Sequence, residues 1–178
     1  MTIFRIIAAL AAVTIASPAA AALKPGTKAP NIVTTGAIAG KPFRLNLQRE
    51  LRKGPVVLYF YPKAFTKGCT LEARAFSEAS PAFRKAGARV IGLSADDLST
   101  LKRFSVEECR NAFPVATATA ATIKAYDVAM PVAGKLKTMS NRTSYVIAPN
   151  GRIAFVHSDL DWSEHVTKTL AAVRAPKK

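Results

Sequence analysis

The sequence predicts an α/β domain, because two short apolar runs flank a helical segment and a hairpin signal follows them. Residues 55–61 form a continuous apolar run rich in β-branched and aromatic residues, as expected of a strand buried on both faces. Residues 88–94 form a second run, and the helical spacing between the two predicts a βαβ unit with parallel strands. The Pro-Asn-Gly sequence at residues 149–151, between strands expected at residues 144–148 and 152–157, predicts a hairpin.

The rest of the chain is less regular. We expect residues 24–40 to be loop-like, with a brief strand pairing at Ile32-Val33 as the exception. An edge strand at residues 43–47 and one helical turn up to Lys53 should follow. The Ser80-Pro81 pair predicts a break in the crossover helix, because serine caps helices and proline suits their first position. Further elements are expected later in the chain: helices from Leu98 towards Cys109, at residues 123–128 and from Ser163 to Val173, and a polar basic loop at residues 131–141.

The first 22 residues are typical of an export signal. A short cationic start with Arg5 precedes an apolar core at residues 6–15, which is too short to span a bilayer. Small residues follow and predict cleavage after Ala21 or Ala22, although a retained amphiphilic anchor is the alternative. We therefore expect a signal peptide at residues 1–22 and one domain at residues 23–178. In a Gram-negative bacterium the mature protein would be periplasmic and free of the membrane.

The chain is strongly basic, with 26 lysines and arginines against 11 aspartates and glutamates and a formal net charge of +15. Such a balance favours anionic partners. The basic residues are scattered, however, and no aromatic signature of RNA binding lies among them. We interpret the charge as a solvated basic face and expect no nucleic-acid partner; a basic binding module is the alternative.

Cys69 lies where the strand at residues 55–61 gives way to a helix. Pro62 ends the strand, Gly68 gives the turn its freedom, and helical spacing begins near Thr70. The unpaired N–H groups of a first helical turn favour an anion. The charged residues nearest in sequence are mainly basic: Lys63, Lys67 and Arg74. We therefore expect Cys69 to be largely thiolate near neutral pH; the alternative is a small buried apolar residue.

The spacing of Pro62, Thr66 and Cys69, Pro-x-x-x-Thr-x-x-Cys, resembles the active-site pattern of the peroxiredoxins. The stretch from Val57 to Glu72 around it is similar to the Q-type, bacterioferritin-comigratory-protein-like branch. The sequence Arg-Thr-Ser-Tyr-Val-Ile at residues 142–147 resembles the place where that family has an arginine entering a strand. The resemblance covers nearly all of the chain after the leader. It implies a thioredoxin-like fold with a central mixed β-sheet flanked by helices.

The resemblance also implies a thiol peroxidase acting on hydrogen peroxide and organic hydroperoxides. Cys69 would be the peroxidatic nucleophile that becomes a sulfenic acid. Thr66 would hydrogen-bond the thiolate and the peroxide, and Arg142 would stabilise negative charge in the transition state. Pro62 would shield the thiolate, and Glu72 would orient the arginine. Each has a simpler interpretation as well: a helix cap for Thr66, ordinary charges for Arg142 and Glu72, and a strand end for Pro62.

Cys109 is the candidate resolving cysteine. Many Q-type members place that cysteine five residues after the nucleophile, where this chain has Arg74, while others resemble this chain in having it on the third helix. The preceding Glu107-Glu108 pair should disfavour a Cys109 thiolate relative to Cys69. We expect the two cysteines to lie apart in the reduced protein and to meet after local unfolding. If they do not meet, the enzyme is a one-cysteine peroxidase.

We expect no cofactor and no metal. His157 and His165 have no second ligand at metal-binding spacing and are interpreted as surface or core histidines, and Trp162 as packing the last helix onto the sheet. The expected partners are a peroxide and a thioredoxin-like or small-thiol reductant, and the expected state is a monomer. The competing interpretation is an exported, non-catalytic thioredoxin-like domain with a structural Cys69–Cys109 disulfide.

Overall fold

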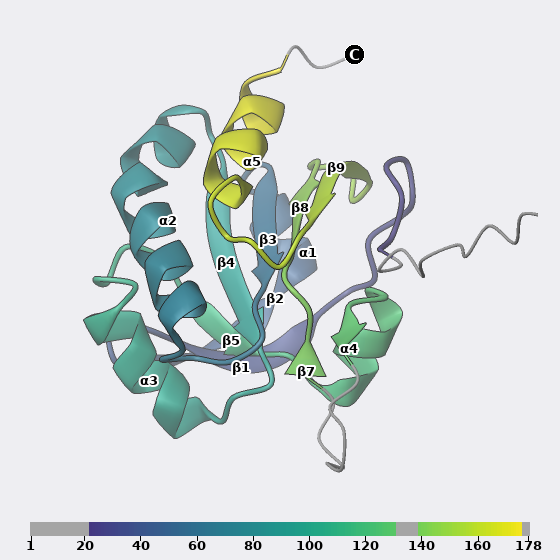
Figure 1. Cartoon of the computed structure of the whole chain (residues 1–178). Coiled ribbons are helices and arrows are strands. Elements are labelled where there is room, and N and C mark those ends of the chain that lie inside the picture. The colour runs from purple at the N-terminus through teal and green to yellow at the C-terminus, as the bar shows by residue number, and fades with distance from the viewer. Residues whose placement is uncertain (1–21, 131–138, 176–178) are drawn as a thin grey trace, which may run out of the picture.

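A seven-stranded mixed sheet forms the centre of the protein, with helices on both faces (Figure 1). The computed structural model describes residues 22–130 and 139–175. The strand order in the sheet is β2-β1-β5-β4-β3-β8-β9. Its strands are β1 (Val33–Ile38), β2 (Lys41–Asn46), β3 (Val56–Phe60), β4 (Arg89–Ser94), β5 (Val115–Thr117), β8 (Thr143–Ile147) and β9 (Ile153–Ser158). The helices are α1 (Leu47–Leu51), α2 (Lys67–Lys85), α3 (Leu98–Glu107), α4 (Ala120–Ala125) and α5 (His165–Arg174).

Strand β3 is the central strand of the fold, and all five of its residues are buried. Successive side chains of a strand point to opposite faces. Val57 and Tyr59 accordingly belong to the apolar cluster covered by α2, α3 and α5, whereas Leu58 and Phe60 belong to the cluster covered by α1 and α4. The continuous apolar run in the sequence is explained by these two cores.

The predicted βαβ unit and hairpin are both confirmed. Strands β3 and β4 are parallel, while β8 pairs with the other edge of β3 in the antiparallel direction and continues into β9. In the β3–β8 register Thr143 lies opposite Phe60. Because the chain enters β8 beside the point where it leaves β3, Arg142 is brought to the segment that carries Cys69.

The predicted break at Ser80-Pro81 is wrong, since α2 continues through Pro81. The Ser80 hydroxyl does not cap a new helix but donates to the Phe76 carbonyl at 2.9 Å. Proline inside a helix removes one backbone hydrogen bond. Phe76 and Phe83 on either side are both buried in the same cluster, and their burial outweighs the lost hydrogen bond.

The predicted loop at residues 24–40 is also partly wrong, because β1 and β2 form a hairpin there. The turn residues Ala39 and Gly40 both have positive φ, 48° and 73°. Two-residue hairpin turns of this kind favour Asn-Gly or Asp-Gly. With alanine in the first position the turn signal is weak, which is why the sequence did not predict the hairpin.

Two predictions fall wholly or largely outside the described residues. These are the signal peptide, apart from Ala22, and the basic loop, of which residues 131–138 are not described. At the end of that loop β7 (Met139–Ser140) pairs with β6 (Ala129–Met130) as a separate two-stranded sheet. In the described part of the chain no helix combines the length and apolar character needed to cross a membrane.

Candidate active site

Cys69 lies in the first turn of α2, as predicted. Thr66 has the extended backbone of an N-cap residue, so Cys69 is the third residue of the helix. This turn contains no acidic residue. Cys69 is 2 % exposed and packs in the cluster with Tyr59 and Tyr61. The sulfur is therefore held at the positive end of the helix dipole and is largely screened from water.

The loop that connects β3 to α2 carries Pro62 and Thr66. Pro62 is half-buried, two residues after the end of β3, and Thr66 is exposed. The Thr66 hydroxyl donates to the Lys63 carbonyl at 2.9 Å. Its single proton is thus occupied within the loop, and the predicted hydrogen bond from Thr66 to the sulfur stays a prediction for the peroxide-bound enzyme.

Asp96 fixes this loop to the neighbouring strand. Its Oδ2 accepts the backbone N–H of Ala64 at 2.7 Å and the hydroxyl of Ser94 at 2.8 Å. No sequence pattern pointed to a role for Asp96. Its position just after β4 was a signal that could have found it. The carboxyl ends of the parallel strands β3 and β4 lie at the same edge of the sheet, so Asp96 is expected near the loop that follows β3.

Arg142, which directly precedes β8, reaches the sulfur of Cys69. Its side chain is buried, its Nη2 donates to the Sγ of Cys69 at 3.6 Å, and its Nε donates to the Leu160 carbonyl at 2.9 Å. Its Nη1 donates to Oε2 of Glu72. The guanidinium is therefore fixed by three partners and aimed at Cys69, as the resemblance implied, and Glu72 orients it.

Gly68 leaves the space into which this guanidinium fits. A Cβ atom built on Gly68 would lie 3.2 Å from Nη2 of Arg142 and 3.8 Å from Cδ1 of Trp162. Any larger residue would press on the arginine. Trp162 was expected only to pack the last helix onto the sheet; its ring in fact lies beside the first turn of α2.

Glu72 is completely buried, and burial raises its pKa to about 8 although Arg142 opposes the shift. Oε2 of Glu72 binds the arginine, whereas Oε1 has no hydrogen-bond partner among the described residues. This shift favours the neutral carboxyl, whereas the contact with Arg142 favours the carboxylate. Nη1 of Arg142 can donate a hydrogen bond to Oε2 whether the carboxyl of Glu72 is neutral or ionised.

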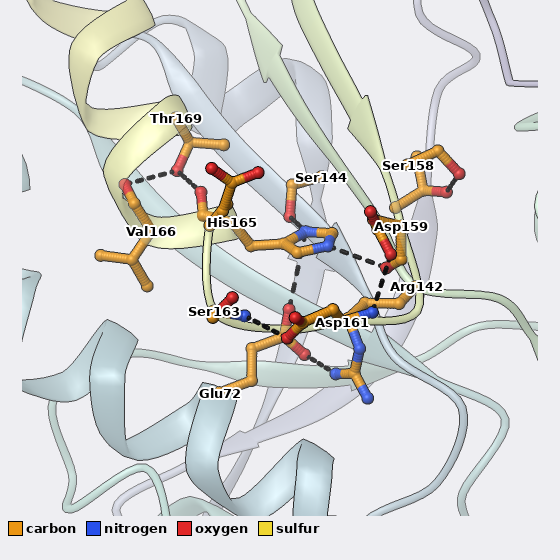
Figure 2. A network of polar contacts seen from close by, with 12 residues as sticks. Glu72, Arg142, Ser144, Ser158, Asp159, Asp161, Ser163, His165, Val166 and Thr169 are labelled. Atoms are coloured by element: carbon orange, nitrogen blue, oxygen red, sulfur yellow. Dashed lines mark hydrogen bonds and ion pairs between the residues drawn. The ribbon is translucent and has the colours of Figure 1, made fainter.

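His165 extends the network behind Glu72, as Figure 2 shows. Its Nδ1 lies 2.8 Å from the Ser144 hydroxyl and 3.7 Å from Oε1 of Glu72, and its Nε2 lies 3.0 Å from the Asp159 carbonyl. Burial lowers the pKa of His165 to about 4. His165 is thus a core histidine, as one of the two simple interpretations had it. Its contact with Glu72, 93 positions away in the chain, could not be predicted because no sequence spacing links the two residues.

Cys109 follows α3 and is buried in the same apolar cluster as Cys69. Neither cysteine forms a disulfide. Burial, and secondarily the charge of Glu108, raises the pKa of Cys109 well above its usual range. This direction agrees with the prediction that the thiolate form of Cys109 is disfavoured. Free thiols give no support to a structural Cys69–Cys109 disulfide.

Both neighbours of Cys109 are bound to α2. Arg74 donates to Glu108 at 2.7 Å, and Arg110 donates to Glu78 at 3.2 Å. Arg110 and Asn111 have positive φ, 48° and 59°, a conformation that costs free energy for residues other than glycine. The two ion pairs therefore hold a backbone segment that is itself strained. Within the described residues, no cluster of three or more metal-ligating side chains is present.

The fold and this site define the class of the protein: a thioredoxin-fold thiol peroxidase. The chain belongs to the AhpC/TSA family, whose model matches residues 25–156. It is 32 % identical to a chloroplastic peroxiredoxin Q of rice over 94 % of this chain and 81 % of the relative. It is also 32 % identical to the peroxiredoxin Bcp of Xanthomonas campestris, over 69 % of this chain and 78 % of the relative.

Solved structures agree with this assignment. The crystal structure of the peroxidoxin BcpB from Mycobacterium tuberculosis superposes with a TM-score of 0.76 at 31 % identity, covering 88 % of this chain and 99 % of that one. Peroxiredoxin Q of Xanthomonas campestris superposes with a TM-score of 0.67 at 29 % identity, covering 79 % and 89 %. The resemblance to the Q-type branch and the thioredoxin-like fold are thus confirmed.

Proposed function

We propose that Cys69 is the peroxidatic nucleophile that reduces hydrogen peroxide and small organic hydroperoxides. The observation that carries the proposal is the contact between Nη2 of Arg142 and the sulfur of Cys69. An arginine remains charged at every physiological pH, so it stabilises a thiolate and the charge that develops as the O–O bond breaks. The N–H groups of the first turn of α2 act in the same direction.

The first half of the reaction uses the thiolate, the peroxide and one proton from solvent. The thiolate attacks one peroxide oxygen, the S–O bond forms and the O–O bond breaks. The electron pair of the O–O bond leaves with the second oxygen, which takes up a proton and departs as water or an alcohol. Cys69 remains as a sulfenic acid. Thr66 would orient the peroxide after its hydroxyl turns away from Lys63.

The substrate class is supported by the relatives. A structure of the Xanthomonas campestris bacterioferritin comigratory protein is described in terms of alkyl peroxide reduction activity, and that chain is 29 % identical to this one. Because Cys69 is 2 % exposed, a peroxide reaches the sulfur when the loop carrying Pro62 and Thr66 moves. The exposed position of Thr66 places that loop at the surface.

We infer that Cys109 resolves the sulfenic acid. Cys109 attacks the sulfur of the oxidised Cys69, the S–O bond breaks, and water leaves as the Cys69–Cys109 disulfide forms. Both residues are buried, Cys69 in α2 and Cys109 in the turn after α3, so the first turn of α2 and the segment after α3 must unfold locally. A thioredoxin-like protein or a small thiol then reduces the disulfide. If Cys109 does not resolve, the external thiol reduces the sulfenic acid directly.

We also propose that residues 1–22 direct export and are removed, leaving a periplasmic, monomeric domain at residues 23–178. Leu23 is already part of the fold, since its backbone N–H donates to the Tyr145 hydroxyl at 3.2 Å. N-terminal sequencing of protein recovered from the periplasm tests the cleavage site. A chain that keeps its first 22 residues after export would contradict the proposal.

The central test compares wild type with Cys69→Ser and Cys109→Ser in peroxide reduction with a thioredoxin-type donor. Cys69→Ser should lose the reaction with peroxide altogether. Cys109→Ser should still consume one equivalent of peroxide but turn over slowly with that donor. Unchanged turnover of Cys109→Ser would show a one-cysteine enzyme, and an active Cys69→Ser would refute the proposed nucleophile.

A further inference from the structure

Phe65 is a strained residue in the loop of residues 61–66 that joins β3 to α2. Its φ of 63° lies in the left-handed region, which bulky residues rarely adopt. Its aromatic side chain is nevertheless 37 % exposed. A strained backbone persists where the surrounding structure holds it. The contacts that the ring makes must therefore explain the conformation.

The ring of Phe65 is held by two consecutive residues of α3, the helix beside the start of α2 (Figure 1). It packs edge-on against the ring of Phe104, with centroids 5.2 Å apart and planes at 85°. The guanidinium carbon of Arg103 lies 5.1 Å from the centroid of the Phe65 ring. Edge-to-face rings and a cation over a ring are both favourable arrangements. The loop that precedes Cys69 is thereby fastened to α3.

Phe104 also holds the segment that carries Cys109. Its carbonyl oxygen accepts the backbone N–H groups of Glu108 and Cys109, both at 3.0 Å. Its ring is completely buried and stacks on Tyr61, with centroids 5.4 Å apart and planes at 24°. Phe104 is thus joined to the loop of residues 61–66 by its ring and to Cys109 by its carbonyl group. One residue connects the segments of the two cysteines.

Backbone strain is present at both ends of this connection. Phe65 has positive φ on the side of Cys69, and Arg110 and Asn111 have positive φ on the side of Cys109. This conformation costs free energy for residues other than glycine. Unfolding of either segment releases that cost, and the contacts of Phe104 oppose the release. Each segment is therefore held closed in part by the other.

Oxidation of Cys69 weakens the closed state on the side of the loop. Nη2 of Arg142 donates to the sulfur, and such a hydrogen bond is stronger when the acceptor is charged. A sulfenic acid removes the negative charge from sulfur and adds an oxygen atom where Cys69 is only 2 % exposed. The first turn of α2 then loses part of its attachment and needs more space. Thr66, the N-cap of that turn, directly follows Phe65, so the ring is displaced when the turn opens.

We propose that Phe65 is a positioning residue for the resolution step, whose ring couples opening of the first turn of α2 to release of Cys109. The inference rests on the proposed role of Cys109 as the resolving cysteine. In the closed protein the ring keeps Phe104, and through its carbonyl group Cys109, in place. When the loop opens, the end of α3 loosens and the thiol of Cys109 is freed. Its sulfur then forms the S–S bond, the S–O bond breaks, and the departing oxygen takes the thiol proton and leaves as water.

The ion pairs around Cys109 do not supply this coupling. They join Glu108 to Arg74 and Arg110 to Glu78. Arg74 and Glu78 lie at least one turn beyond the first turn of α2, which begins at Lys67. These pairs can remain formed while the first turn opens. The ring of Phe65, by contrast, belongs to the part of the chain that moves.

The first test is amide hydrogen exchange of the reduced protein, followed by NMR. In Phe65→Leu the ring contacts are lost, so the amides of Glu108 and Cys109 should exchange about three- to tenfold faster, the factor that one aromatic pair supplies. Phe65→Tyr keeps the ring and should restore the wild-type rates. Val33→Ala, at an exposed apolar residue of β1, is the control and should change neither amide.

The amide of Thr70 reports on the other segment, because it donates to the Thr66 carbonyl at 2.9 Å in the first turn of α2. Faster exchange in Phe65→Leu at Thr70 alone, with Glu108 and Cys109 unchanged, would show that the two segments open independently. Unchanged exchange at all three amides would show that the ring holds neither segment closed. Either result would refute the inference.

The second test follows formation of the disulfide after one equivalent of peroxide by quenched-flow mass spectrometry. Formation of the sulfenic acid depends on the concentration of peroxide and the disulfide step does not, so the two rates separate. Phe65→Leu should speed the disulfide step about threefold or more. In a Phe104→Leu background the same change should add little, because the partner ring is already absent. The exchange experiment needs no change in the core and still decides the matter if Phe104→Leu does not fold.

The outcomes separate this inference from the proposed function. An unchanged or slower disulfide step in folded Phe65→Leu, or an equal gain in both backgrounds, would overturn the coupling alone. A wild-type protein that forms no Cys69–Cys109 disulfide with peroxide would overturn the proposed resolving role of Cys109.

Discussion

Nη2 of Arg142 donates a hydrogen bond to the Sγ of Cys69 at 3.6 Å, although 73 positions separate the two residues in the chain. The antiparallel pairing of β8 with β3 makes this contact possible, because it places the residue before Thr143 beside the residues after Phe60. The contact joins a fixed positive charge to the nucleophile. Four predictions follow from it and from its surroundings.

Replacing Arg142 should slow the reaction with peroxide severely. Arg142→Lys keeps the charge but loses the planar group that reaches Glu72, Leu160 and Cys69 together. We expect the second-order rate constant to fall about 10²-fold, the scale of losing one transition-state donor. Stopped-flow fluorescence of Trp162, the protein's one tryptophan, measures it. Arg44→Lys on the exposed edge strand β2 is the control, and a loss below threefold for Arg142→Lys would contradict the prediction.

Gly68→Ala should slow the reaction with peroxide without lowering the stability of the protein. Alanine is the better helix residue by roughly 0.5–1 kcal/mol, so the melting temperature should hold or rise. Its Cβ, at 3.2 Å from Nη2 of Arg142, pushes the guanidinium away from the sulfur, so the rate with peroxide should fall about tenfold. In an Arg142→Lys background the same change should cost much less. An equal loss in both backgrounds would show that Gly68 acts independently of the arginine.

Loosening the segment around Cys109 should speed formation of the disulfide. The Arg74–Glu108 and Arg110–Glu78 ion pairs hold both neighbours of Cys109 on α2. Partly exposed pairs contribute about 0.2–1 kcal/mol, so Arg74→Gln should raise the rate of disulfide formation after one equivalent of peroxide up to about fivefold. Quenched-flow mass spectrometry measures this rate. Lys53→Gln, which breaks the distant Lys53–Glu50 pair, should have no effect; a slower or unchanged rate in Arg74→Gln would count against the prediction.

His165 should make the protein less stable in acid. Burial lowers its pKa from 6.5 to about 4, so the unfolded chain binds a proton before the folded protein does. The contribution of the neutral ring to stability is present above pH 6.5 and is lost as the pH falls from 6.5 towards 4. Urea unfolding should show the stability gap between wild type and His165→Gln shrinking by about 3 kcal/mol over that window. A gap that stays constant with pH would show that the ring titrates normally in the folded protein.

Much of the fold could be predicted from local patterns. Local sequence predicted three features: the apolar run that forms β3, the second run that forms β4, and the Pro-Asn-Gly hairpin. In each, residues adjacent in the chain favour a strand or a turn by themselves. The errors arose where tertiary contacts outweighed those preferences. Pro81 stays inside α2 because Phe76 and Phe83 are both buried against the sheet, and the Ala39-Gly40 turn forms because β1 and β2 pair along their whole length.

The sequence by itself determined that a cysteine begins a helix after a buried strand, among basic residues, in the spacing of a peroxiredoxin. Chain neighbours alone set that arrangement. Only the tertiary structure decided that Arg142 points at the sulfur, that Asp96 fixes the loop, and that His165 stands behind Glu72. These contacts join residues far apart in the chain, and they depend on strand pairing and on burial. Burial is also what changes the pKa values of Glu72 and His165, because removing a group from water disfavours its charged form.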